Sequence, residues 1–304
     1  MPAPATRIES LSVLNAQDGT SKIYCAELYD YFYDTVTNYA LSTILKNKLY
    51  PGTPVPGGSI TIRRMAMGQS KAYGTARAAG KGDAPQLREY VVPIDKRREI
   101  IEEIEDMDVA MLPATDVINR KITAQGQTAA REMDRAFFAT AITAGTMYTP
   151  ESGAAIDQIV DGLLDTLCTV SNQFVDGVSR DQIALVCAPS AYSLLRNKID
   201  QLSNPNVDTT PYEYGRFHGA RIYQSIHVPT TAAFVAMALE SLLQPIAFNQ
   251  FEIAKSPYGF STIVKTAYAY GTGAVTPDLI YYVTDEALQE ALHPPEPPEI
   301  DQGT

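Results

Sequence analysis

The chain has 304 residues, of which 45% are hydrophobic and 19% charged, so it holds enough apolar material for one large folded domain or two small ones. Its formal net charge of -11 argues against a protein that holds nucleic acid by charge, because phosphate binding depends on clustered Lys and Arg. Three widely spaced cysteines without a CxxC pair, and no apolar run of about 18 residues, argue against a disulfide framework, a zinc site and a membrane-spanning helix, and predict a chain made in the cytoplasm.

The N-terminal region is predicted to be an arm followed by one helix. Residues 1–25 are largely polar and contain Pro2, Pro4 and Gly19, which favours an extended arm that needs a partner surface. Over residues 26–48, apolar and aromatic side chains recur at helical spacing, so we expect one amphipathic helix. This helix should end before the run of Pro and Gly that follows it.

Residues 49–95 are expected to form an extended loop. Alternation at Ile60 and Ile62 and a β-favouring run at residues 87–94 predict a long two-stranded hairpin with a Gly-rich tip. Residues 59–88 carry six cations against a single acid, Asp83, and these cations are Arg63, Arg64, Lys71, Arg77, Lys81 and Arg88. A loop of this length without a core of its own usually acts on something outside its domain. We therefore expect this basic arm to have no binding surface on its own subunit and to lie on the next one.

An acidic segment follows the basic arm. Ile100, Ile101 and Ile104 recur at helical spacing within residues 96–111, which predicts a helix with these side chains on one face. The other face would carry six acids, which are Glu99, Glu102, Glu103, Glu105, Asp106 and Asp108. An ordinary solvated helix face would look the same. A basic arm and an acidic ridge on one molecule can complement a copy of it, and such head-to-tail contacts close into rings or larger assemblies.

One domain is predicted from two separate parts of the chain, residues 96–150 and 251–285. Its first part contains a long amphipathic helix from about residue 115 to residue 141. Its second part contains short β segments at residues 251–254, 261–270 and 279–283. These last strands need a partner, so we expect them to return to the domain built by residues 96–144.

Residues 151–250 are predicted to form a second, α/β domain. The pattern is a helix over residues 156–174, a buried strand over 183–188 and a helix over 189–199. Short strands follow at residues 221–225 and 232–238. Residues 286–304 are rich in Pro and acids, so this tail is predicted to be extended or disordered.

Several segments in this order are similar to one protein family. The loop reads SITIRRMAMGQSKAYGTARAAGKGDAPQLREYVVPI, and the long helix reads DVINRKITAQGQTAAREMDRAFFATAI. Then follow IDQIVDGLLDTLCTVSNQF, IALVCAPSAYSLLRNKI, GRFHGARIYQSIHVP and FEIAKSPYGFSTIVKTAYAYGTGAVTPDLIYYV. Over nearly its whole length the chain resembles the phage major capsid proteins with the HK97 fold. The similarity is one of architecture, because none of these segments is a catalytic signature.

The resemblance implies an α+β fold with an N-terminal arm, an extended β-hairpin loop, a long spine helix, a peripheral domain and an axial domain. It implies a structural protein, not an enzyme: a subunit of the hexamers and pentamers of an icosahedral head that encloses double-stranded DNA. The protein would be made in the host cytoplasm and found in the virion. Its partners would be copies of itself, scaffolding, portal and decoration proteins and the enclosed DNA, with no membrane and no cofactor. Encapsulin-type compartment shells look similar and are the near alternative.

An acidic α/β enzyme with a basic lid loop is the alternative from another class. The sequence offers it no catalytic, cofactor-binding or metal-binding set, since the segment from Gly74 to Lys81 departs from a phosphate loop at two points. Asp157, Asp161 and Asp165 lie four residues apart on one predicted helix face, which is more typical of a solvated stripe than of a metal site. The candidate functional residues are therefore the six cations of the arm and the six acids of the ridge, as contacts between subunits.

Overall fold

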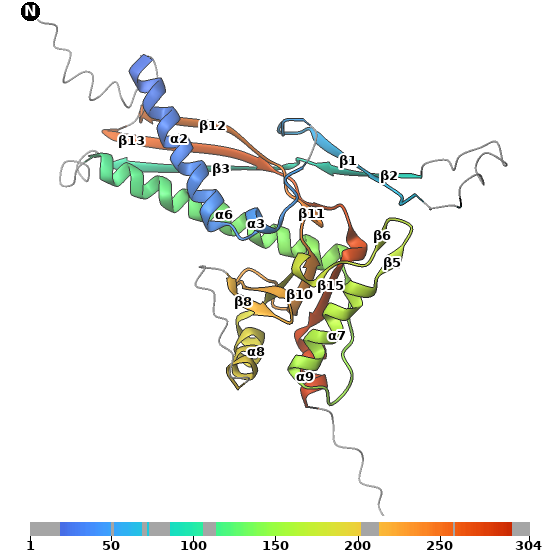
Figure 1. Ribbon diagram of the computed structural model, residues 1–304. Helices are drawn as coiled ribbons and strands as arrows, with labels where there is room; N and C mark the ends of the chain where they lie inside the picture. The colour runs from blue at the N-terminus through green and yellow to red at the C-terminus, as the bar shows by residue number, and fades with distance from the viewer. Residues whose placement is uncertain are drawn as a thin grey trace, which may run out of the picture.

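The computed structural model describes residues 19–49, 52–68, 72, 86–105, 114–201, 213–257 and 259–293. Its two larger sheets have three and six strands, and a separate two-stranded hairpin extends away from the body (Figure 1). Helix α6 (Ala114–Ala144) links the sheets, because Ile122 and Met133 lie in the core beside the smaller sheet, whereas Phe137 and Phe138 lie in a core beside the larger one. The long helix predicted from the sequence is confirmed, and at 1.5 Å per residue it is roughly 46 Å long.

The three-stranded antiparallel sheet, which we call the peripheral sheet, has the order β12 (Ile246–Lys255), β13 (Ser261–Tyr270) and β3 (Lys96–Glu105). Helices α6 and α2 (Gly19–Tyr39) cover one of its faces, and Ile104 from β3 is buried in that core. The prediction of a helix over residues 96–111 is wrong for the part that the structure describes. The spacing of the isoleucines fits a helix, but ten residues of β3 pair in register with β13, and this tertiary pairing outweighs the local pattern.

The predicted N-terminal helix exists but ends earlier than expected. Helix α2 ends at Tyr39, and a short helix α3 (Ser42–Leu45) follows it. The break is held by the buried carboxylate of Asp134 in α6, which accepts hydrogen bonds from the backbone N–H groups of Leu41 and Ser42 at 3.1 and 2.9 Å. Buried backbone donors need such a partner where a helix stops. The helix also begins earlier than expected, so the predicted arm of residues 1–25 is wrong for residues 19–25, which belong to α2. Residues 1–18 lie outside the described residues.

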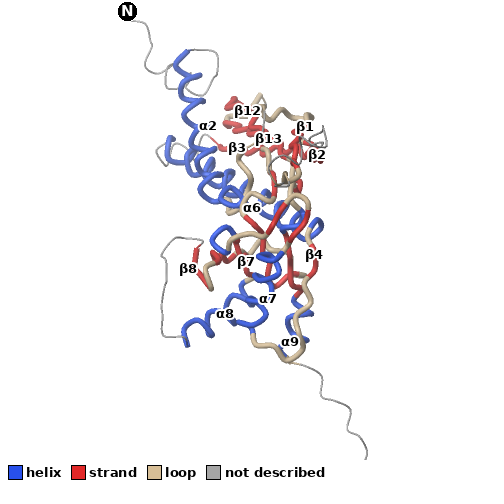
Figure 2. Tube along the Cα trace, turned by 45° about the vertical axis from the view of Figure 1, so that its right-hand side comes forward, coloured by secondary structure: helices blue, strands red, loops and turns tan. Residues whose placement is uncertain are grey.

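The six-stranded sheet, which we call the axial sheet, lies near the C-terminal half of α6. Its strand order is β4 (Thr146–Met147), β15 (Ile280–Thr284), β10 (Ala232–Ala238), β7 (Ile183–Cys187), β9 (Ala220–Gln224) and β8 (Glu213–Phe217). Strands β7 and β10 are buried on both faces, which explains their continuous apolar sequences. One face packs against the helices α7 (Ile156–Thr169), α8 (Pro189–Gln201) and α9 (Asp285–Leu292) and the other against α6. Helices α8 and α9 lie at the end of the molecule away from the peripheral sheet (Figure 2).

Two expectations about the C-terminal region are wrong. Strand β15 does not return to the domain built by residues 96–144, because it pairs with β10 in the middle of the axial sheet, where Ile280 and Val283 are buried. The prediction of an extended or disordered tail over residues 286–304 is wrong for residues 286–292, which are helical, whereas residues 294–304 lie outside the described residues. The hydroxyl of Thr284 accepts a hydrogen bond from the backbone of Ala287 at 3.2 Å and caps helix α9, and Leu288 anchors that helix in the core.

Candidate assembly interface

The predicted hairpin is formed by β1 (Ser59–Met65) and β2 (Leu87–Pro93), which pair antiparallel over seven residues each. Side chains of successive residues point to opposite faces of such a ribbon. Ile60 and Val92 pair on the face toward the body and are buried. Lys71, Arg77 and Lys81 come between β1 and β2 in the sequence and lie outside the described residues, so their predicted role stays a prediction.

The base of the hairpin is fixed to its own subunit. Ile60, Val92 and Ile94 form a buried cluster with side chains that include Leu243 and Val275 from the body. The backbone is locked as well, since Ile94 exchanges hydrogen bonds of 2.9 and 2.8 Å with the turn that precedes β1. The expectation that the basic arm has no binding surface on its own subunit is therefore wrong for β1 and β2.

Arg64 also binds within the subunit. Its two terminal nitrogens donate to the two carboxylate oxygens of Asp278 at 2.7 and 3.0 Å, and Asn172 donates to the same carboxylate at 2.6 Å. The guanidinium lies 4.9 Å from the ring centre of Phe174. Burial by itself would raise the pKa of Asp278, but the hydrogen bonds from Arg64 and Asn172 lower it below its ordinary value. With its side chain only 10% exposed, Arg64 serves as a clamp between the hairpin and the body.

The outward face of the hairpin carries an apolar surface. Arg63 donates to Glu89 on the facing strand at 2.8 Å, and this exposed pair is worth only about 0–1 kcal/mol. The pair lies between the exposed side chains of Met65 and Leu87 on one side and that of Val91 on the other. We call Met65, Leu87 and Val91 the hairpin face, and they are 67%, 46% and 59% exposed.

Sequence reasoning missed this surface because it followed the charges of the arm. The signal that could have revealed it is the two-residue alternation of the predicted hairpin, which places Met65 and Leu87 on the same face as Arg63 and Glu89. Arg88, another candidate cation, lies 5.3 Å from the ring centre of Tyr90 on its own strand.

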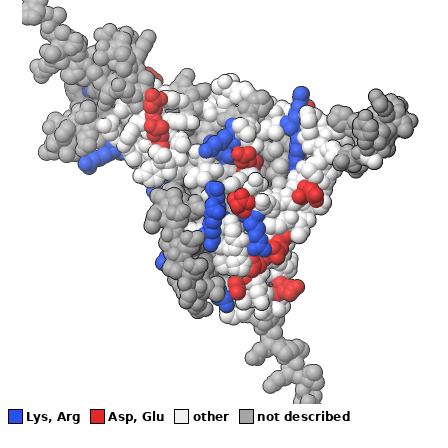
Figure 3. All heavy atoms as spheres, viewed as in Figure 1, with Lys and Arg blue, Asp and Glu red and all other residues white. Residues whose placement is uncertain are grey.

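The candidate acids do not form a helical ridge, because strand alternation divides them between two faces. Glu102 points toward α6 and lies 3.6 Å from Lys121. Glu99 and Glu103 lie on the uncovered face of the peripheral sheet, where Glu103 accepts a hydrogen bond from Ser261. The side chain of Glu105, and all of Asp106 and Asp108, lie outside what the structure describes. On the face seen in Figure 3, cationic and anionic side chains are interspersed and do not separate into two patches.

A groove with a volume of about 570 Å³ lies on the uncovered face of the peripheral sheet. It is bounded by the segment before β1 on one side and by β3 and β13 on the other, and its lining includes Val55, Pro56, Arg97, Glu99, Ala267 and Ala269. The groove therefore combines apolar side chains with a cation and an acid. Glu99 has no ion-pair partner among the described residues.

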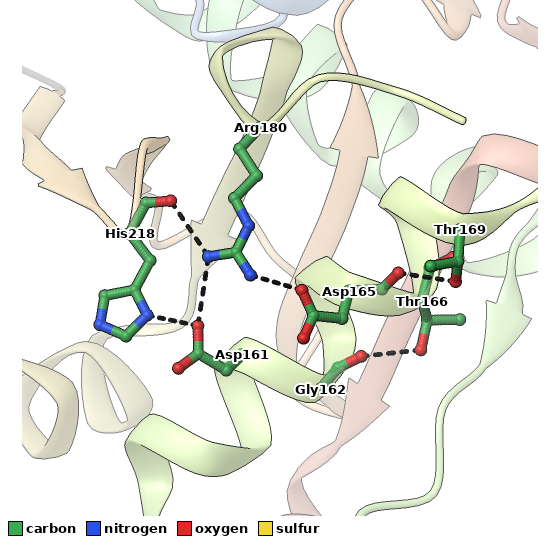
Figure 4. A network of polar contacts seen from close by, with 7 residues as sticks. All are labelled: Asp161, Gly162, Asp165, Thr166, Thr169, Arg180 and His218. Carbon is green, nitrogen blue, oxygen red and sulfur yellow. Dashed lines mark hydrogen bonds and ion pairs between the residues drawn. The ribbon is translucent and has the colours of Figure 1, made fainter. Parts of the chain in front are cut away.

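The three aspartates of the predicted solvated stripe are partly exposed but paired, and two of them meet one arginine (Figure 4). Arg180 contacts Asp165, lies 3.5 Å from Asp161 and donates to the backbone carbonyl of His218 at 3.2 Å. Asp161 also contacts Nδ1 of His218. These contacts fix the β8–β9 turn, where His218 and Gly219 have positive φ angles of 47° and 93°, against α7.

The third aspartate has a different partner. Asp157 lies 3.7 Å from Lys198, which joins the start of α7 to α8. Within the described residues no group of three or more His, Cys, Asp or Glu side chains is arranged to hold a metal ion. None of the described helices is both long and apolar enough to cross a membrane. The aspartates of α7 thus connect elements of the axial part of the molecule.

Comparison with known proteins yields similarity in structure but not in sequence. No family model and no curated protein matches the chain. The capsid of Ralstonia phage GP4 is 11% identical with a TM-score of 0.59, over 82% of this chain and 89% of that one. The capsid structure of the cyanophage P-SCSP1u is 15% identical with a TM-score of 0.58, over 76% and 84%. A virus-like particle from Pyrococcus furiosus is 14% identical with a TM-score of 0.54, over 85% and 98%.

Identities this low show a shared fold and nothing more specific. The shared part nevertheless includes most of each chain, so it spans both the peripheral and the axial sheets. The α+β architecture expected from the order of the sequence segments is confirmed. The chain has the HK97-like fold of phage capsid subunits.

Proposed function

We propose that this chain is a major capsid subunit that assembles into the hexamers and pentamers of an icosahedral phage head and encloses double-stranded DNA. The observation that carries the proposal is the fold, which the chain shares over 82% of its length with the capsid of Ralstonia phage GP4. The exposed hairpin face supports it, because a subunit of a shell needs a surface that only another copy covers. In the assembled particle the protein is a component of the virion.

The hairpin face is the part of the subunit that we assign to the contact between copies. The hairpin projects from the body, while its base is held by the Arg64–Asp278 clamp (Figure 1). A rigid base lets the apolar side chains meet a neighbour without a large loss of conformational entropy on docking. Apolar side chains at the centre of a contact contribute more to its free energy than exposed ion pairs at its rim.

The receiving surface in this proposal is the uncovered face of the neighbour's peripheral sheet, with its groove of about 570 Å³. Lys71, Arg77 and Lys81 of the hairpin tip would meet Glu99 and the other acids near β3. Such rim pairs set the register of the contact more than its strength. Arg63, Arg64 and Glu102 already have partners in their own subunit, so the original set of inter-subunit candidates becomes smaller.

The proposed domain division follows the two sheets. The peripheral domain contains the peripheral sheet and most of α6, and the axial domain contains the axial sheet with α7, α8 and α9. Strand β15 belongs with the axial domain in this division. Scaffolding, portal and decoration proteins are the further partners that a phage head of this kind would need.

Electron microscopy of the purified protein tests the proposal. We expect closed shells, or rings of five and six copies, with nucleic acid inside particles isolated from the phage-infected host. A monomer or small oligomer at all concentrations would contradict the assembly role. Shells that hold protein cargo and no DNA would support the compartment-shell alternative in place of the phage head.

A further inference from the structure

A cavity of about 400 Å³ lies where the middle of α6 meets the loop after β9. Helix α6 contributes Gln127 and Arg131 to its wall, and the loop contributes Ser225 and His227. The C-terminal end of α2 closes it with Tyr39. Most of these side chains are polar, so the cavity is suited to a polar ligand.

Arg131 lines this cavity, and Arg135 lies close to His227 in its wall. Arg131 and Arg135 are separated by one helical turn, and both are exposed. Neither has a carboxylate within ion-pair distance among the described residues. Both guanidinium groups lie close enough to His227 to lower the pKa of its imidazole, after burial, which is the larger cause. Two guanidinium groups and an imidazole therefore share one small region of the surface.

The acids nearest to these arginines are already occupied. Asp134 borders the cavity, but its two oxygens accept the hydrogen bonds from the backbone between α2 and α3. Glu132, between the two arginines in sequence, accepts hydrogen bonds from Tyr268 and Tyr270 at 3.0 and 3.1 Å. Hence the guanidinium groups of Arg131 and Arg135 remain available to an anion from outside the subunit.

We propose that this cavity, with Arg131 in its wall and Arg135 beside it, is a binding site for a phosphate group of the DNA backbone. A guanidinium presents donors in a planar fork that matches phosphate oxygens, and two such groups one turn apart can hold one phosphate or two successive ones. The neighbouring amide of Gln127 adds further donors. This inference rests on the proposed function, which supplies the DNA as the ligand.

A local site also agrees with the acidic sequence. With a net charge of -11, the subunit as a whole repels DNA, so it is not a general nucleic-acid binder. A few phosphate sites on one face would tether the DNA in register with the shell while the remaining surface stays repulsive. Contacts of this kind carry no sequence information, which suits a container that must accept a whole genome.

Binding of a fluorescently labelled DNA duplex of about 20 base pairs to the purified subunit tests the site, measured by anisotropy over a series of salt concentrations. The Arg131→Gln/Arg135→Gln variant should bind more weakly at low salt. Its plot of log affinity against log salt should have a slope shallower by about 2, since each lost phosphate contact removes about 0.9. Arg88 in β2 and Arg216 in β8 are exposed and lie outside the cavity lining. The control variant Arg88→Gln/Arg216→Gln removes the same net charge and should bind like the unsubstituted subunit, apart from a small uniform loss.

Further arms decide between sources of the anion. The variant Arg131→Lys/Arg135→Lys keeps the positive charge but not the planar guanidinium groups. Its circular dichroism spectrum should show that the fold is retained, and it should bind the duplex only partially. Equal losses and equal slopes in the Gln variants at both places would overturn the proposal. So would an Arg131/Arg135-dependent site that binds only inorganic phosphate, or only a peptide of residues 294–304, and not the duplex. Shell formation is scored separately by microscopy, so a failure of the capsid role is distinguishable from a failure of this site.

Discussion

Removing the apolar side chains of the hairpin face should prevent assembly and leave the subunit folded. Met65, Leu87 and Val91 are 67%, 46% and 59% exposed, so about half of each side chain remains to be covered by a partner. Complete burial of such a side chain contributes about 1.5–3 kcal/mol. The three together therefore contribute about 3–5 kcal/mol to each contact, before the cost of immobilisation.

The variant Met65→Ser/Leu87→Ser/Val91→Ser tests this by light scattering at increasing protein concentration. Because about 1.4 kcal/mol corresponds to a factor of ten, assembly should need a concentration at least about 100-fold higher. The melting temperature should change little, since these side chains face solvent in the isolated subunit. Leu194→Ser on α8, which is 39% exposed, is the matched control and should assemble normally. Normal assembly of the triple variant, with an unchanged melting curve, would refute the assignment of the hairpin face.

Three further predictions concern the subunit itself. Arg64→Ala should lower the free energy of unfolding by about 2 kcal/mol. Because the pKa of Asp278 is lowered in the folded state, the stability that its carboxylate contributes is present above its ordinary pKa and is lost as pH falls through its folded-state pKa. Acid titration of the unsubstituted protein and of Arg64→Ala measures this loss of stability. Gly271→Ala should cost about 1–3 kcal/mol in denaturant melts, because its Cβ would overlap a backbone carbonyl of the hairpin base, whereas Gly68→Ala should be neutral. Burial lowers the pKa of Lys46 to about 8 from 10.5. Between these two pH values only the unfolded chain keeps the proton, so the free energy of unfolding should rise with pH there by on the order of 2 kcal/mol. Lys46→Met should lack this increase.

The elements that the sequence predicted well are those whose pattern coincides with their final environment. Helix α6 has a long amphipathic stripe, and strands β7 and β10 are continuous apolar runs that are buried on both faces. Strands β10 and β13 have the predicted bounds, residues 232–238 and 261–270. In these segments local propensity and tertiary packing favour the same structure, so the local sequence is sufficient to predict it.

The elements that it mispredicted depend on partners far away in the chain. Strand β3 has isoleucines at helical spacing, and only its pairing with β13, more than 150 residues later, makes it extended. Strand β15 likewise depends on a distant partner, since it pairs with β10. No local signal in its sequence distinguishes this pairing from pairing with the peripheral sheet.

The candidate site was predicted only in part. Its location on the hairpin follows from the unusual length of the loop. Charge counting, however, cannot show that Arg64 finds Asp278 across 214 positions of sequence, or that Arg63 finds Glu89 on the facing strand. The exposed apolar side chains that remain become visible only when these pairs are known.

Cryo-electron microscopy of the assembled particle tests the central claim most directly. We predict a closed shell in which the hairpin face of one copy lies against β3 and β13 of the next, with Met65 and Val91 buried in the contact. A particle in which those side chains remain in solvent, or a protein that stays monomeric under all conditions that preserve its fold, would contradict the claim.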